Sequence, residues 1–172
     1  MTCALAMMAP MRSNEIFSRM SPEAALAFLE EVHREAPKVE EIALSAAAGA
    51  FRLRPTFLRR QPRKRQSEWM RQALARTAFA AVAEEVLAEY FLEYHAGLLG
   101  ELLDALGLEH ENGILKGDGP PVCPDKAKLE QAVAGFRTGD QRERRELLLR
   151  AFAAQSLVDW PELEALLELG GA

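Results

Sequence analysis

The chain has 172 residues, of which 49% are hydrophobic, 27% charged and 7% aromatic, with a formal net charge of −5. This composition is that of a folded globular domain, and it excludes an intrinsically disordered or collagen-like chain. The length suits one domain, and no segment approaches the roughly 18 consecutive apolar residues of a membrane helix. The two cysteines, Cys3 and Cys123, lack the spacing of zinc and redox sites, so we expect a cytoplasmic protein.

Residues 1–12 are expected to form a disordered tail, and residues 13–172 a single domain. The first ten residues are apolar, but they follow no basic region and their apolar stretch is short, so they do not fit a secretory signal peptide. Either Met1 or Met11 could be the true start. A sub-boundary within the domain would fall in the loop at residues 109–124.

Helix start signals dominate the chain after the tail. Ser21, Pro22 and Glu23 combine an N-cap, a proline at the first helical position and an acid in the first turn. A second helix begins at Pro37. Two further prolines divide residues 52–65, which we expect to form a connection with one turn of helix.

Residues 67–95 contain neither proline nor glycine, and they carry apolar side chains at every fourth position. The pattern predicts the longest helix of the protein. Its charge-free middle, residues 77–83, has no polar face, which is typical of a helix at the centre of a bundle. A charge placed at Val82 is therefore expected to destabilise the fold strongly.

The last third of the chain is expected to hold a helix cap, one long loop and three short helices. Gly107 fits the glycine position of a Schellman cap. Residues 109–124 contain three prolines and form the loop, in which Asn112 and Gly113 could close a short hairpin. Each of the three helices that follow has an aspartate as its predicted N-cap: Asp125, Asp140 and Asp159.

These patterns predict an all-α, single-domain bundle of seven or eight helices around a long central helix at about 67–95. The capping motifs that begin the last two helices recur after 19 residues, close to the period of a helical solenoid. One recurrence is not a repeat, since a solenoid needs about three units to be stable. We therefore favour the bundle, with the solenoid as the alternative.

Two adjacent blocks of opposite charge are the most distinctive feature of the sequence. Residues 51–76 carry nine basic side chains and one acidic side chain, whereas residues 77–118 carry nine acidic side chains and one basic side chain. Because elements joined by short loops are usually neighbours, we expect the blocks to pair within the chain or across an antiparallel homodimer. The acidic partners would be Glu84, Glu85, Glu89, Glu93, Glu101 and Asp104.

The homodimer hypothesis also rests on the helix dipole. Arg71 and Arg76 would lie near the N-terminus of the predicted 67–95 helix, where the dipole disfavours positive charge. A symmetric antiparallel partner would place acidic side chains beside these arginines and offset that cost.

The alternative role of the basic block is anion binding. The block precedes the N-terminus of the predicted long helix, where unpaired N–H groups and the dipole favour a phosphate group. Phe57 and Trp69 could stack on the bases of RNA or single-stranded DNA, and a phosphorylated protein is a further candidate partner. The candidate anion-binding residues are Arg59, Arg60, Arg63, Lys64, Arg65 and Trp69.

The three histidines do not fall into a known metal-binding motif. Glu89 and Glu93 could supply half of a di-metal site in a bundle, but the Glu-x-x-His pairs that complete such a site are missing from the helices. Glu93 and His95 would point about 200° apart on a helix, so they could not share an ion. We predict neither a metal nor a cofactor, and Glu89, Glu93 and His95 are the nearest candidates for metal ligands.

Sequence motifs for serine catalysis, nucleotide hydrolysis and dinucleotide binding are also missing. We therefore expect a non-enzymatic binding or scaffolding protein that acts through a helix face on a protein partner or on a second copy of itself. Binding of nucleic acid or phosphate through residues 52–76 is the alternative. The third hypothesis is a helical enzyme or metal protein whose site residues converge only in three dimensions.

Overall fold

The computed structural model describes residues 10–169 and has the all-α fold that the sequence predicted. Within these residues there are ten α-helices, where seven or eight were expected, together with one 3₁₀ helix and one two-stranded hairpin. They are α1 (Ser13–Arg19), α2 (Pro22–Glu35), α3 (Pro37–Phe51), α4 (Pro55–Arg59), α5 (Arg63–Leu74), η1 (Thr77–Phe79), α6 (Ala80–Tyr94), α7 (Ala96–Ala105), β1 (His110–Glu111), β2 (Ile114–Leu115), α8 (Lys126–Arg137), α9 (Arg142–Ala153) and α10 (Pro161–Leu169). None of the helices in this range is long and apolar enough to cross a membrane.

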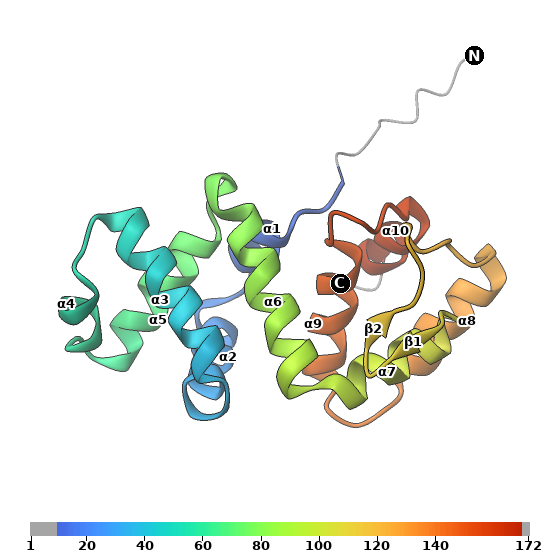
Figure 1. The fold of residues 1–172 in the computed structure, drawn as a ribbon, viewed down its shortest axis with the longest axis horizontal. Coiled ribbons are helices and arrows are strands. Elements are labelled where there is room, and N and C mark those ends of the chain that lie inside the picture. The colour runs from blue at the N-terminus through green and yellow to red at the C-terminus, as the bar shows by residue number, and fades with distance from the viewer. Residues whose placement is uncertain (1–9, 170–172) are drawn as a thin grey trace, which may run out of the picture.

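Helix α6 lies at the centre of the bundle (Figure 1). It packs against α1 and α3 and also against α7 and α9, and its buried side chains include Val86, Leu87, Tyr90 and Phe91. Helices α2–α5 lie to one side of α6 in the figure, and α7–α10 with the hairpin lie to the other side. The buried hydrophobic residues of both sides belong to one connected core.

The packing excludes the solenoid alternative. In a solenoid each repeat contacts only its neighbours along the chain. Here α1 contacts both α6 and α9, and α6 contacts both α3 and α9. The helices therefore surround a shared core as in a bundle.

The continuous central helix predicted at 67–95 is wrong. A turn at Ala75 and Arg76 separates α5 from η1 and α6, and Arg76 has an extended backbone with ψ at 138°. Distant helices stabilise this turn. The Asn14 side chain donates to the carbonyl of Ala75 at 3.3 Å, and the Arg76 side chain donates to the carbonyl of Ala50 at 3.1 Å. These bonds satisfy peptide groups that end a helix, and helical periodicity gives no sign of them.

The apolar packing predicted all round residues 77–83 is also wrong. Thr77 and Ala81 are exposed, and Val82 is only half-buried. The fully buried part of α6 begins at Ala83 and continues on one face of the helix. A charge at Val82 therefore has a route to water and is less costly than a charge in the buried face.

Several predicted helix caps are confirmed. The Ser21 hydroxyl accepts a backbone N–H in the first turn of α2, and the Asp125 carboxylate does so in α8. Gly107 follows α7 with φ at 71° and with the hydrogen bonds of a Schellman motif. Asp140 is not the N-cap of α9: Gln141 takes that position with φ at 61° and makes no capping bond with its side chain.

The packed part of the chain begins earlier than the sequence suggested. Met11 is buried, and its backbone N–H donates to the carboxylate of Glu164 in α10 at 3.2 Å. Packing therefore starts at Met11 and not at residue 13. The rest of the predicted tail, residues 1–9, lies outside the described residues.

The long loop after α7 contains the short hairpin that the sequence allowed. Asn112 and Gly113 turn the chain with φ angles of 51° and 85°, and His110 pairs with Leu115 across the strands. Gly113 packs so closely on α7 that a Cβ atom there would lie 2.9 Å from a methyl carbon of Leu99. The glycine thus permits both the turn and the close approach of the hairpin to α7.

Candidate functional site

The basic block pairs with acids of α3 and not with the acidic block at 77–118. The carboxylate of Glu41 contacts Arg59 at 2.5 Å, and that of Glu40 contacts Arg63 at 2.8 Å. Within residues 10–169 no ion pair joins the two blocks. Because the chain turns after α5, this helix packs on α2 and α3, and Arg63 at its start meets Glu40 of α3, while Arg59 of α4 meets Glu41.

The acidic block has partners of its own. They are Ser156 for Glu84, Lys38 for Glu93, Arg145 for Glu101 and His110 for Asp104. The predicted pairing of the two blocks within the chain is therefore wrong. The helix dipole does not disfavour Arg71, because this residue lies in the last turn of α5, where the dipole favours positive charge.

Three of the predicted anion-binding residues remain free of acidic partners. Arg60, Lys64 and Arg65 are exposed, and none has a carboxylate partner in the part of the chain that the structure describes. Lys64 lies in the first turn of α5, whose N-cap, Pro62, provides no side-chain hydrogen bond. Arg59 and Arg63, in contrast, are held by α3.

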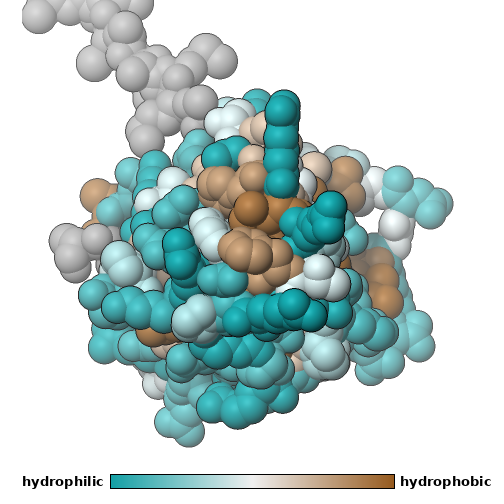
Figure 2. Space-filling view, turned by 90° about the vertical axis from the view of Figure 1, so that its left-hand side faces the viewer, coloured by the Kyte–Doolittle hydropathy of each residue, from teal (hydrophilic) through white to brown (hydrophobic). Residues whose placement is uncertain are grey.

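An aromatic pair lies beside these cations. The rings of Phe57 and Trp69 are 6.0 Å apart, and the Arg65 guanidinium lies 5.1 Å from the centre of the Trp69 ring. Figure 2 shows the end of the molecule that carries α4, where hydrophilic side chains surround a small apolar patch. The start of α5 thus combines exposed positive charge with a partly exposed aromatic surface.

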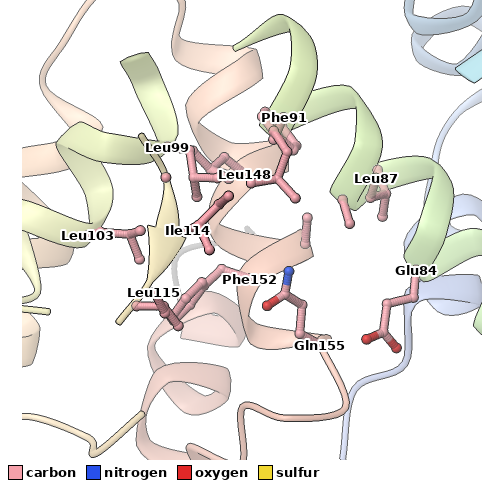
Figure 3. Close-up of a pocket in the computed structure, with 14 residues that line it drawn as sticks. Glu84, Leu87, Phe91, Leu99, Leu103, Ile114, Leu115, Leu148, Phe152 and Gln155 are labelled. Carbon is pink, nitrogen blue, oxygen red and sulfur yellow. The ribbon is translucent and has the colours of Figure 1, made fainter. Parts of the chain in front are cut away.

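A second candidate site is a small apolar groove between α6, α7, the hairpin and α9 (Figure 3). Its apolar lining includes Leu87, Phe91, Leu99, Leu103, Leu115, Leu148 and Phe152. Leu92 and Ile114 also line it, with 37% and 65% of their surface exposed. Glu84 and Gln155 form a polar end. We call this space the α6–α9 groove.

The size of the α6–α9 groove limits what it can bind. Its volume is about 190 Å³. Small-molecule and cofactor sites usually enclose about 300–1,000 Å³, whereas a cavity of about 150 Å³ accommodates one benzene molecule. The groove therefore has room for one or two large apolar side chains and is too small for a typical cofactor.

A third candidate is a polar cluster where α2, α9 and the junction of α6 with α7 meet. Arg144 of α9 donates to the Tyr90 hydroxyl at 3.2 Å and also binds the carboxylate of Glu31. His95, at the α6–α7 junction, has its Nε2 3.8 Å from Glu31 Oε1, and its ring lies 4.6 Å from the Tyr90 ring. Glu31, Tyr90 and Arg144 also line a wider surface depression between α2 and α9.

The surroundings of this cluster shift the pKa values of its members. Burial, and then the neighbouring charge of Glu31, raise the pKa of Tyr90 well above its usual range. Burial, and then the charge of Arg144, lower the pKa of His95. Both side chains are therefore neutral at pH 7, and the Nε2 atom of His95 is buried with no hydrogen-bond partner in residues 10–169.

The sequence named Glu89, Glu93 and His95 as the nearest metal-ligand candidates but did not identify the acids that His95 faces. Glu93 instead forms an ion pair with Lys38, and His95 lies beside Glu31 and Glu35 of α2. The three ligand atoms of this second set lie within 4.8 Å of one another. The spacing of the two glutamates was visible in the sequence, but the histidine that faces them comes from a distant segment.

Comparison with protein-family models, curated proteins and solved structures finds no match to this chain. The function of the protein is therefore inferred from the geometry of these three regions.

Proposed function

We propose that this protein is a non-enzymatic binding protein of the cytoplasm that receives apolar side chains from a helix of a partner protein. The α6–α9 groove carries this proposal, because it is apolar and Leu92 and Ile114 remain exposed beside it. Exposed apolar side chains beside an apolar depression are typical of protein–protein binding sites, where a few buried anchors supply most of the affinity.

A helix suits the α6–α9 groove better than an added strand. The two strands beside the groove have two residues each, so they offer almost no edge for strand addition. A bound helix presents apolar side chains three or four positions apart on one face, and the groove has room for one or two of them. Gln155, at the polar end, can form hydrogen bonds with the polar flank of such a helix.

The state of Cys123 supports a binding role over cysteine catalysis. Burial, and then the negative charge of Glu162, raise the pKa of the Cys123 thiol. A catalytic cysteine needs a lowered pKa, because the thiolate is the nucleophile. Cys123 therefore stays protonated and weakly reactive at neutral pH.

The proposal is tested by selecting helical peptides from a display library against the full chain. We expect the selected peptides to carry apolar residues three or four positions apart and to bind with a Kd of about 1–100 µM. Ile114→Glu and Leu92→Glu should each weaken binding about tenfold or more, because a charge then faces the apolar surface. Val122→Glu is the matched control, since Val122 is 82% exposed and does not line the groove.

The same variants define the outcomes that contradict the proposal. If Ile114→Glu binds the selected peptides as tightly as the natural chain, the groove is not the binding site. Sedimentation of the natural chain as a dimer, with Ile114→Glu a monomer, would identify the occupant as a second copy of the chain. That result would replace the proposed hetero-partner by a homodimer.

Nucleic-acid binding at the start of α5 is the second candidate function. The observation that favours it is the Phe57–Trp69 pair with the exposed Arg65 beside it, in a segment that also carries the exposed Arg60 and Lys64. The test is the fluorescence anisotropy of a labelled single-stranded oligonucleotide. With about four engaged cations, log K should fall with log salt at a slope of about −3, and Trp69→Ala should weaken binding. Salt-independent binding, or none, would exclude this function.

A further inference from the structure

Three metal-ligating side chains converge on one point outside the α6–α9 groove. Glu31 and Glu35 are four residues apart on α2, so their carboxylates lie on the same face of the helix. His95 comes from the junction of α6 and α7, where φ of −138° and ψ of 38° interrupt the helix. One ligand atom from each side chain lies within 4.8 Å of the other two.

The histidine provides an independent observation that points to a ligand. Its side chain is only 13% exposed, and its Nε2 atom is buried with no hydrogen-bond partner among residues 10–169. A buried polar atom without a partner is rare and costs stability. The 3.8 Å between this nitrogen and Glu31 Oε1 is too long for a hydrogen bond.

The charged groups around this point leave carboxylate oxygens for a cation. Glu31 and Glu35 carry two negative charges, with Arg144 paired to Glu31 and the exposed Arg34 3.8 Å from Glu35. Arg144 occupies Oε1 of Glu31 and leaves the second carboxylate oxygen for a metal. Arg144 also bonds Tyr90 and so holds the Glu31 carboxylate in place, as the outer partners of metal ligands commonly do.

We propose that Glu31, Glu35 and His95 bind one divalent transition-metal ion, with zinc preferred over magnesium and calcium. Magnesium and calcium take oxygen ligands almost exclusively, whereas imidazole with carboxylates suits zinc and its neighbours in the first transition row. The ion joins the end of α2 to the α6–α7 junction, so zinc stabilises the folded chain. This site is separate from the α6–α9 groove and does not depend on the proposed function.

The test is a zinc titration of the full, tag-free and metal-free chain by calorimetry at pH 7. We expect one ion per chain with a Kd of about 10 µM or lower. His95→Ala and Glu35→Gln should each weaken binding about tenfold or more, since a ligand contributes at least as much as its outer partners. His33→Ala is the matched control, because His33 also contacts a glutamate but joins no three-residue cluster among residues 10–169.

A second readout locates the ion directly. In a ¹⁵N NMR spectrum of the histidine rings, zinc should shift the Nε2 signal of His95 and leave that of His33 unchanged. No binding at about 1 mM zinc, or equal binding by the natural chain and Glu35→Gln, overturns the proposal. Half of the Glu35 side chain is exposed, so this variant keeps the test valid even if His95→Ala fails to fold.

Discussion

Two clusters of histidine, glutamate and arginine involve α2, and they show how the same residue types acquire different properties. In the exposed cluster, Nδ1 of His33 lies 2.9 Å from a carboxylate oxygen of Glu40, and Arg63 contacts the same carboxylate at 2.8 Å. The His33 side chain is 49% exposed, so water reaches this side of the cluster, whereas the Glu40 side chain is 14% exposed. Ion pairing and solvent satisfy the polar groups, and no ligand is needed.

In the buried cluster the same residue types leave one atom unsatisfied. Arg144 binds Glu31 and Tyr90, but the Nε2 atom of His95 has no partner within the described chain. Burial removes the water that would otherwise solvate this nitrogen. Residue types and spacing alone therefore do not distinguish a candidate site from an ordinary ion pair. Burial and an unsatisfied polar atom do.

The largest expected difference between the clusters follows from removing the arginine. Arg144→Met should lower the free energy of unfolding by about 2–3 kcal/mol, because it leaves a largely buried carboxylate and a buried hydroxyl without their partner. Arg63→Met should cost less, about 1–2 kcal/mol, because Glu40, although only 14% exposed, keeps its contact with the half-exposed His33. Urea unfolding of both variants measures the difference. Equal losses would show that the clusters do not differ in burial as described.

A smaller effect is expected for the Tyr90 hydroxyl. Tyr90 is 1% exposed, and its hydroxyl accepts a hydrogen bond from Arg144. Tyr90→Phe should lower the free energy of unfolding by about 1–2 kcal/mol, since the packing is kept and one buried bond is lost. Tyr94→Phe, on the same helix but only half-buried, is the control and should change little. A neutral result for Tyr90→Phe would mean that the bond to Arg144 contributes nothing.

The pH dependence of stability tests the lowered pKa of His95. The folded chain holds the pKa of His95 below 6.5, because burial and Arg144 outweigh the opposing charges of Glu31 and Glu35. The unfolded chain, with a pKa near 6.5, therefore takes up the proton first as the pH falls. The contribution of His95 is complete above about pH 6.5 and is lost as the pH falls toward its folded pKa.

Urea unfolding between pH 7.5 and 5 in the presence of a chelator measures this effect. His95→Gln should flatten the decline in stability toward acid by about 1 kcal/mol or less. A decline that His95→Gln leaves unchanged would contradict the lowered pKa.

The smallest stability effect is expected for the exposed basic side chains at residues 60–65. Exchange of Arg60, Lys64 and Arg65 together for glutamate should change the free energy of unfolding by less than about 1 kcal/mol, because exposed charges contribute little. Thermal melts check this. A loss above about 2 kcal/mol would show that these cations pair with acids, for example across a dimer. If the surface binds nucleic acid, the same exchange abolishes that binding.

Features that depend on a few neighbouring residues were predictable from the sequence. The caps at Ser21 and Asp125 and the Schellman turn at Gly107 use hydrogen bonds within one helical turn, so their signals lie in the local sequence. The predictions that failed concern contacts between residues that are distant in the sequence. The turn at Ala75 and Arg76 depends on Asn14 and Ala50, which no local pattern connects to it.

The candidate metal site shows the same limit. The sequence pattern places Glu93 and His95 in one continuous helix. In the structure the backbone leaves the helix at His95, and the His95 ring lies beside α2. Nothing near His95 in the sequence indicates Glu31, which is 64 positions earlier. The predicted pairing of the two charge blocks failed for the same reason, because the turn after α5 brings Arg63 against Glu40 on α3.

The all-α class, several helix ends and the segregation of charge could be predicted from the sequence, because helical periodicity, capping and composition are local properties of the chain. Helix α1 and the break between α5 and α6 could not. Tertiary structure alone decided where the long apolar pattern breaks, which acids meet which bases, and which histidine is left without a partner. Each of these depends on how helices cross in space, and burial then decides whether a polar group is satisfied by water or remains open to a ligand.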